Sequence, residues 1–132
     1  MKRVYIFDTT LRDGGQTKGV DFSFADKIAI SEALDDLGID YIEGGWPGAN
    51  PTDDKLFGSP PKLKVSNFVA FGMTRRPNTS AANDPGLNAV LSGKSDSVCL
   101  VGKTWDFHVS KALNITLEEN IDMISESINE IN

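Results

Sequence analysis

Short apolar runs alternate along the chain with segments whose apolar residues recur at helical spacing. The apolar runs predict strands at residues 4–7, 39–42, 63–71 and 97–101. The helical spacing predicts helices at residues 24–37, 85–91 and 117–131, with a shorter helical turn at 53–57. Four strands, each followed by helical sequence, are typical of a parallel sheet with right-handed crossovers.

The predicted helices carry start and stop signals. Ser23 with Asp26, and Thr116 with Glu119, fit the capping-box pattern, and Gly38 is suited to end the first long helix. The last helix has the clearest apolar face. That face is formed by Leu117, Ile121, Ile124, Ile128 and Ile131.

Two architectures contain parallel βα units, the (β/α)₈ TIM barrel and the doubly wound sheet. No glycine pattern of the dinucleotide-binding type follows the first strand, which favours the barrel. A complete barrel needs about 250 residues, and this chain has 132. We therefore predict an α/β fold in which residues 1–132 form the N-terminal half of a TIM barrel, with four parallel βα units. On this prediction the chain is a partial catalytic domain, either a truncated piece of a longer enzyme or an incomplete gene product.

Composition narrows the possible partners and compartment. The net charge of −6 argues against nucleic acid and anionic membranes as partners. Cys99 is the only cysteine, so no internal disulfide can form, and its apolar surroundings predict a buried core residue. The N-terminus does not resemble a signal peptide, and no apolar run approaches membrane-spanning length, so we expect a cytoplasmic protein.

The polar residues that follow the first strand are the strongest candidates for chemistry. Arg12 is a permanent cation whose planar fork can hold an oxyanion, and Asp13 is a hard oxygen ligand for a divalent cation. Gly14 and Gly15 then allow a tight turn. The alternative is a salt-bridged Arg-Asp turn without a function.

Residues 8–16, with the sequence Asp-Thr-Thr-Leu-Arg-Asp-Gly-Gly-Gln, resemble the signature of the family that includes 2-isopropylmalate synthase, homocitrate synthase, citramalate synthase and hydroxymethylglutaryl-CoA lyase. The resemblance implies a TIM barrel with a divalent metal (Mg²⁺, Mn²⁺ or Zn²⁺) that makes or breaks a carbon–carbon bond next to an acyl thioester. It implies that Asp13 is a metal ligand and that Arg12 binds substrate and stabilises charge on the attacked carbonyl. Gln16 would reach the substrate or a metal-bound water, unless it is a surface glutamine. The loop at residues 45–48 resembles citramalate synthases more than 2-isopropylmalate synthases.

Further candidates follow the other strands, at the face that carries active sites in barrels. Glu43 closes the second strand; the family has a glutamate there that sets the metal site or orients the arginine, and the alternative is a structural pairing with Arg12. Arg75 and Arg76 follow the third strand, where they meet coenzyme A phosphates or form a solvated pair, of which we favour the solvated pair. Thr104, after the fourth strand, is a candidate substrate-binding residue.

The family takes two metal-ligating histidines in a His-x-His pair from a late strand, and this sequence has no such pair. His108, the only histidine, lies too early in the chain, so we predict a local packing or hydrogen-bonding role for it. The general base is also not identifiable among these residues.

The resemblance implies an acyltransferase that condenses acetyl-CoA with a 2-oxo acid and then hydrolyses the thioester, in amino-acid biosynthesis. The 132 residues alone would be inactive. The alternatives are a metal-dependent carbon–carbon lyase, of the hydroxymethylglutaryl-CoA lyase or carboxyltransferase type, and a stand-alone non-catalytic module.

A half barrel has two open sheet edges and an uncovered interior face, so we also expect a homo-oligomer. We expect the side chains that point into that interior to include some of Val4, Ile6, Ile42, Val69, Val98 and Leu100.

Overall fold

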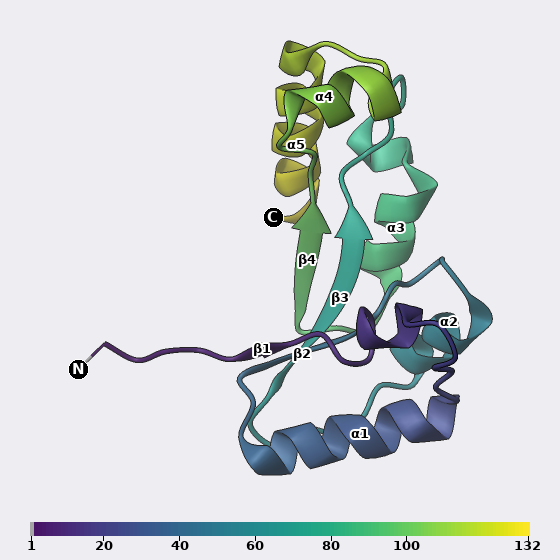
Figure 1. Cartoon of the computed structure of the whole chain (residues 1–132), viewed down its shortest axis with the longest axis vertical. Coiled ribbons are helices and arrows are strands. Elements are labelled where there is room, and N and C mark those ends of the chain that lie inside the picture. Colours follow the sequence, from purple (N-terminus) through teal and green to yellow (C-terminus); the bar gives the residue numbers. More distant parts are fainter. Residues whose placement is uncertain (1) are drawn as a thin grey trace.

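The computed structural model describes residues 2–132 and contains one four-stranded parallel sheet (Figure 1). The strands are β1 (Phe7–Asp8), β2 (Tyr41–Gly45), β3 (Asn67–Met73) and β4 (Ser97–Val101), hydrogen-bonded in the order β1-β2-β3-β4. Each adjacent pair is parallel, and the strand order follows the sequence order. The predicted succession of four parallel βα units is confirmed.

Helices connect and flank the strands. They are α1 (Phe24–Leu37), α2 (Pro51–Gly58), α3 (Pro85–Ser92), α4 (Asp106–His108) and α5 (Leu117–Ile131), with 3₁₀ turns at Gly14–Gln16 and Ala81–Asn83 and a π-helical turn at Val109–Leu113. Figure 1 shows α3 beside β3, and α4 with the first turns of α5 beyond the ends of β3 and β4. The helical turns over residues 106–113 are not predicted by the apolar pattern.

The core lies between one face of the sheet and the helices. Ile42 pairs with Phe68 and Ala70 pairs with Val98, and paired residues of parallel strands point to the same side of a sheet. These side chains pack with apolar residues from the helices and from the residues next to the strands, namely Leu11, Ile39, Leu56, Phe57 and Val90.

The predicted helix signals are confirmed in part. The Ser23 hydroxyl accepts from the Asp26 peptide nitrogen at 3.2 Å, and the Asp26 carboxylate accepts from the Ser23 peptide nitrogen at 2.9 Å, which completes the capping box. Thr116 accepts from the Glu119 peptide nitrogen in the same way. The second box is nevertheless only half formed, because the Glu119 carboxylate binds Arg75 instead.

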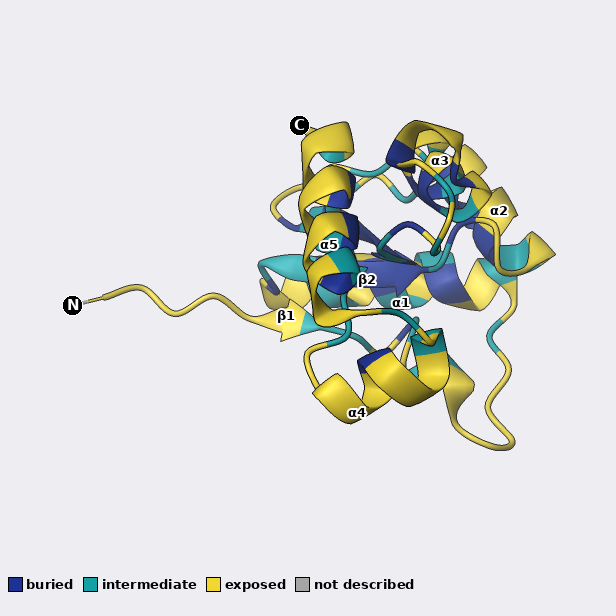
Figure 2. Ribbon diagram, turned by 90° about the horizontal axis from the view of Figure 1, so that it is seen from above, coloured by how far each residue is buried: buried dark blue, intermediate teal, exposed yellow. Residues whose placement is uncertain are grey.

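The first strand is much shorter and more exposed than predicted. Only Phe7 and Asp8 belong to β1, and Val4, Tyr5, Ile6 and Phe7 are all exposed (Figure 2). Among residues 2–132, β1 lies at one edge of the sheet and pairs only with β2. Ahead of it, the chain is held by hydrogen bonds from Tyr41 to the Ile6 carbonyl and from the Ile6 peptide nitrogen to Asp40.

The prediction of which strand residues point into the barrel interior is also partly wrong. Ile42 belongs to the helix-side core and Val98 packs against it. Leu100 lines a hollow with Ile124 and Ile128 of α5, so it too lies on the helix side. Val69 instead pairs with Glu43, one position out of phase with Ile42 and Phe68, and lies on the opposite face as predicted.

Helix α5 forms where its periodicity predicts, and part of its apolar face is exposed. Leu117, Ile121 and Ile128 are exposed, whereas the buried residues of α5 are Asn120, Met123 and Ser127. The predicted self-association of the chain stays a prediction.

Among residues 2–132, the structure contains no helix with the length and apolar character that crossing a bilayer requires. The cytoplasmic location stays a prediction.

Candidate functional site

The predicted residues at the ends of β1 and β2 meet in the folded chain. Arg12 Nε donates to Glu43 Oε2 at 2.7 Å. The Glu43 side chain is only 1% exposed, whereas that of Arg12 is 19% exposed. The carboxylate is therefore buried behind the guanidinium, and the cation lies at the surface of the site. This contact arises because the C-terminal ends of neighbouring parallel strands lie side by side.

Further contacts fix the plane of the Arg12 guanidinium. Nη1 donates to Asp13 Oδ1 at 3.1 Å and to Gln16 Oε1 at 3.3 Å. The guanidinium carbon lies 4.2 Å from the centre of the Phe71 ring, a cation–π contact. Throughout residues 2–132, no side chain or carbonyl accepts a hydrogen bond from Nη2, so this edge can bind an oxyanion or a carboxylate.

Asp13 is suited to be one ligand of a divalent metal but not to hold the metal alone. Its side chain is exposed, and its bond to Arg12 uses one carboxylate oxygen. Carboxylate oxygens are the hard ligands that Mg²⁺ and Mn²⁺ prefer. In the part of the chain that the structure describes, no three His, Cys, Asp or Glu residues are close enough together to form a complete site.

Cys99 lies near Glu43 and is half-buried, not fully buried as predicted. Its burial, the charge of Glu43 and a hydrogen bond to that carboxylate raise the pKa of the Cys99 thiol, while the charge of Arg12 opposes the shift. The thiol is therefore neutral near pH 7, which makes it a poor nucleophile.

The end of β2 approaches other groups so closely that only glycine fits. A Cβ atom at Gly44 would lie 2.3 Å from Phe68 Cζ, and one at Gly45 would lie 2.5 Å from Asp53 Cγ. The strand register shifts between Glu43 and Gly45, which marks a bulge at this point. Bulges are frequent next to active sites because they redirect the side chains that follow.

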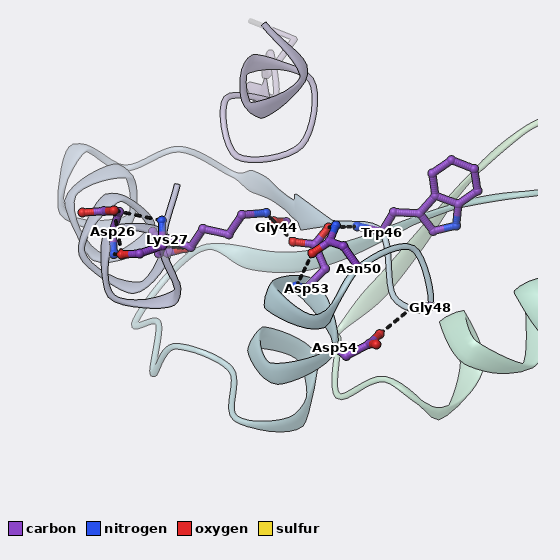
Figure 3. A network of polar contacts seen from close by, with 10 residues as sticks. Asp26, Lys27, Gly44, Trp46, Gly48, Asn50, Asp53 and Asp54 are labelled. Carbon is purple, nitrogen blue, oxygen red and sulfur yellow. Dashed lines mark hydrogen bonds and ion pairs between the residues drawn. The ribbon is translucent and has the colours of Figure 1, made fainter. Parts of the chain in front are cut away.

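A buried ion pair that sequence reasoning missed holds this end of β2 (Figure 3). Lys27 Nζ donates to Asp53 Oδ1 at 2.5 Å and to the Gly44 carbonyl at 3.0 Å. Asp53 Oδ2 in turn accepts from the Trp46 peptide nitrogen at 2.9 Å and from Asn50 Nδ2 at 3.0 Å. Asn50 and Pro51 form a visible helix-start signal around Asp53. No local pattern identifies Lys27, which lies 26 residues earlier in the sequence.

Two hollows adjoin this network. The first, of about 180 Å³, is lined by Arg12, Gln16 and Trp46, among others. The second, of about 240 Å³, lies at the exits of β3 and β4 and is lined by Arg76, Lys103 and Trp46, among others. Trp46 therefore borders both hollows.

Arg75 is not part of a solvated pair, so that prediction is wrong for this residue. Its side chain is buried, Nε donates to Glu126 at 2.5 Å and Nη1 donates to Glu119 at 3.0 Å. Burial disfavours the charge, but the hydrogen bonds to Glu126 and Glu119 outweigh that effect and raise the pKa of Arg75. Arg76, by contrast, is exposed at the second hollow.

Thr104 and His108 follow β4 in the sequence. Thr104 is exposed, and within residues 2–132 it makes no hydrogen bond to the Arg12 group, so its role in substrate binding stays a prediction. His108 packs edge-on against Trp105, with 4.6 Å between ring centres, as expected for a local packing role.

Comparison with known proteins adds independent information. A family model described as HMGL-like matches residues 3–132. The (R)-citramalate synthase of Aquifex aeolicus is 51% identical over 129 residues, which are 96% of this chain and 24% of that protein. The 2-isopropylmalate synthase of Sulfurisphaera tokodaii is 34% identical over 130 residues, 96% of this chain and 31% of that protein. The chain thus spans about a quarter of the length of the citramalate synthase it matches.

A solved structure supports the fold prediction. The crystal structure of the HMG-CoA lyase from Brucella melitensis superposes with a TM-score of 0.71 at 20% sequence identity, covering 98% of this chain and 45% of that one. The four βα units therefore correspond to the N-terminal part of a TIM barrel, as predicted.

Proposed function

Because the chain belongs to the HMGL-like family, we propose that it forms part of the active site of an acyltransferase. The enzyme joins the acetyl group of acetyl-CoA to a 2-oxo acid and then hydrolyses the thioester. The similarity to (R)-citramalate synthase and 2-isopropylmalate synthase supports this reaction class over the reverse, carbon–carbon cleaving one.

The arrangement around Arg12 is the observation that carries the proposal. The guanidinium is held from behind by the buried Glu43 carboxylate and from one side by the Phe71 ring, and none of residues 2–132 accepts a hydrogen bond from Nη2. In the condensation, the methyl carbon of the acetyl group loses a proton and bonds to the keto carbon of the acid, and the carbonyl electron pair moves onto the keto oxygen. A preoriented cation at that oxygen stabilises the transition state more than the ground state.

Arg12 is the residue that we assign to this oxygen, and Glu43 keeps the guanidinium in place. Gln16 binds the same nitrogen of Arg12 as Asp13 and borders the first hollow, where it would contact the acid. Thr104 would contact substrate from the exit of β4. None of the described residues is assigned as the base that removes the acetyl proton.

Asp13 would contribute one carboxylate ligand to a divalent metal, Mg²⁺, Mn²⁺ or Zn²⁺. When bound, such a metal supplies Lewis-acid polarisation of the keto acid. Asp13 is exposed and lies against the Arg12 guanidinium, which allows one acid to contact both.

The test is a thiol-release assay on the complete gene product, supplied with acetyl-CoA and a series of 2-oxo acids. We expect free thiol only when both substrates are present, and a strong loss of that signal in Arg12→Lys. Arg3→Lys is the matched control, because Arg3 is an exposed arginine that pairs with Asp40 away from the site. Absence of thiol release from this mixture, together with cleavage of a separately supplied 3-hydroxyacyl-CoA into acetyl-CoA and an oxo acid, would replace the synthase with a lyase.

A further inference from the structure

The buried ion pair of Lys27 and Asp53 has no part in the proposed reaction. Lys27 lies in the first turn of α1 and Asp53 in the first turn of α2, and their side chains are 8% and 7% exposed. A buried ion pair is often no more stabilising than apolar residues of similar volume. The contacts that the two side chains make with the end of β2 are therefore of more interest than the stability of the pair itself (Figure 3).

The Lys27 ammonium group holds the backbone directly after Glu43. The strand register shifts between Glu43 and Gly45, so Gly44 is the extra residue of the bulge and has no paired residue in β3. Lys27 Nζ donates to the Gly44 carbonyl at 3.0 Å. The lysine thus fixes the bulge next to the residue whose buried carboxylate binds Arg12 Nε.

The Asp53 carboxylate holds a second group that leads to Arg12. It accepts from the Trp46 peptide nitrogen at 2.9 Å. The Trp46 indole packs edge-on against the Phe71 ring, with 5.2 Å between ring centres. The Phe71 ring centre in turn lies 4.2 Å from the guanidinium carbon of Arg12. The two members of the ion pair are therefore connected to the same guanidinium along two separate routes.

We propose that Lys27 and Asp53 are positioning residues for Arg12: their ion pair holds in place the two groups, Glu43 and Phe71, that fix the plane of the guanidinium. Its consequence for catalysis rests on the proposed function, because the pair acts through the arginine that we assign to the keto oxygen. A preoriented donor is effective only while its direction is kept.

The first measurement is NMR spectroscopy of the arginine Nε–H groups in the complete gene product, prepared with isotope-labelled arginine. The Arg12 signal is identified by its loss in Arg12→Lys. In the double variant Lys27→Met/Asp53→Asn we expect this signal to shift or broaden, because the Glu43 carboxylate is no longer held in one place. The Arg75 signal is the internal reference and should not change, since Arg75 Nε binds Glu126 of α5.

Both charges are removed together because a single substitution leaves the other charge buried without its partner, which is strongly destabilising. The double variant keeps similar side-chain volumes, and circular dichroism establishes that it is folded. Its matched control is Lys64→Met/Asp36→Asn, which removes an exposed ion pair of the same residue types at the other end of α1. The control should equal wild type in the Arg12 signal and in turnover.

The second measurement is the turnover of the condensation in the same variants. We expect kcat to fall by about tenfold or more in Lys27→Met/Asp53→Asn, since a misplacement of about 1 Å can cost roughly 10²-fold. Adding Arg12→Lys to the double variant should cost no more than Arg12→Lys alone, because residues that act through one group are not additive.

An unchanged Arg12 signal in the folded double variant would overturn this inference while leaving the proposed function in place. Losses that multiply when Arg12→Lys is added would also overturn it, because the pair would then act independently of Arg12. Wild-type protein without condensation activity would overturn the proposed function, whereas a shifted Arg12 signal in the double variant would still support the positioning.

Discussion

Two arginines stand at strand ends in this molecule, and their surroundings are opposite. At Arg12, after β1, the buried partner is the carboxylate: Glu43 is 1% exposed and the arginine side chain 19%. At Arg75, after β3, the buried partner is the cation, with a side chain 6% exposed, while Glu119 and Glu126 are 37% and 50% exposed. An arginine at a strand end is therefore not in itself a sign of a functional site.

The difference shows what each arginine can do. Both Nε and Nη1 of Arg75 bind carboxylates of α5, and its peptide nitrogen donates to Ser127 at 2.8 Å, so this residue joins β3 to the last helix. Arg12 is held from behind by Glu43, and its Nη2 has no hydrogen-bond acceptor within the described part of the chain, residues 2–132. We infer that Arg75 is a structural connection and that Arg12 is a group available to a ligand.

The largest expected effect concerns Arg12. Arg12→Lys keeps the charge but loses the planar fork, and we expect kcat to fall by about 10²-fold or more, the scale for losing one oxyanion donor. That corresponds to about 2.7 kcal/mol of transition-state stabilisation. Urea unfolding should change little, because lysine can still pair with Glu43. Near-normal turnover in Arg12→Lys would mean that Arg12, like Arg75, has a structural role.

The next largest effect concerns Arg75 and should appear as a lower free energy of unfolding. Arg75→Met removes a buried cation and releases α5 from β3, so we expect unfolding free energy to fall by about 2 kcal/mol, less than for a fully buried pair because the two carboxylates can return to water. Activity per folded molecule should be retained. Arg76→Met, at the exposed neighbour, is the control for urea unfolding. A stable variant with lost activity would instead place Arg75 in the site.

A smaller effect concerns metal binding near Arg12. Asp13→Asn removes a charged oxygen ligand from an otherwise intact turn, and we expect affinity for Mg²⁺ or Mn²⁺ to fall roughly tenfold or more. Calorimetric titration of the complete gene product measures it, with the exposed Glu118→Gln as a control. Equal affinity in both variants would show that Asp13 does not bind the metal.

An effect that appears only at acidic pH concerns Asp35, a buried carboxylate with a structural role. Hydrogen bonds from the peptide nitrogens of Lys64, Val65 and Ser66 keep the pKa of Asp35 well below its usual range, against the opposing effect of burial. The unfolded chain takes up this proton near pH 4. The stabilisation is therefore complete above that pH and declines as the pH falls below it.

Urea midpoints measured between pH 7 and pH 2 should show this decline, and it should be shallower in Asp35→Asn. Activity at pH 7 should stay close to wild type. Identical pH profiles would mean that the bound peptide nitrogens do not stabilise the folded state through the charge of Asp35.

Features set by neighbouring residues could be predicted from the sequence. The Ser23 capping box and the bounds of β4 depend on local patterns, and both are confirmed. The meeting of Arg12 with Glu43 could also be predicted, because parallel strands place their C-terminal ends together.

Features set by distant partners could not be predicted from the sequence. Glu119 and Glu126 lie 44 and 51 residues from Arg75, and no pattern in either segment indicates the other. The apolar runs at residues 4–7 and on α5 indicate which side chains avoid water but not whether a neighbouring element covers them. For that reason the first strand is shorter and more exposed than predicted.

The contact between Gly45 and Asp53 has a consequence for the evolutionary history of this site. A side chain at residue 45 requires Asp53 to shrink or move, and without Asp53 the buried Lys27 loses its anion and Trp46 loses its anchor. Single substitutions at any of these positions should therefore be removed by selection, whereas coordinated exchanges can survive. Across homologous sequences, residues 27, 45 and 53 should vary as a linked set, and lineages that change the set should also differ at residue 46.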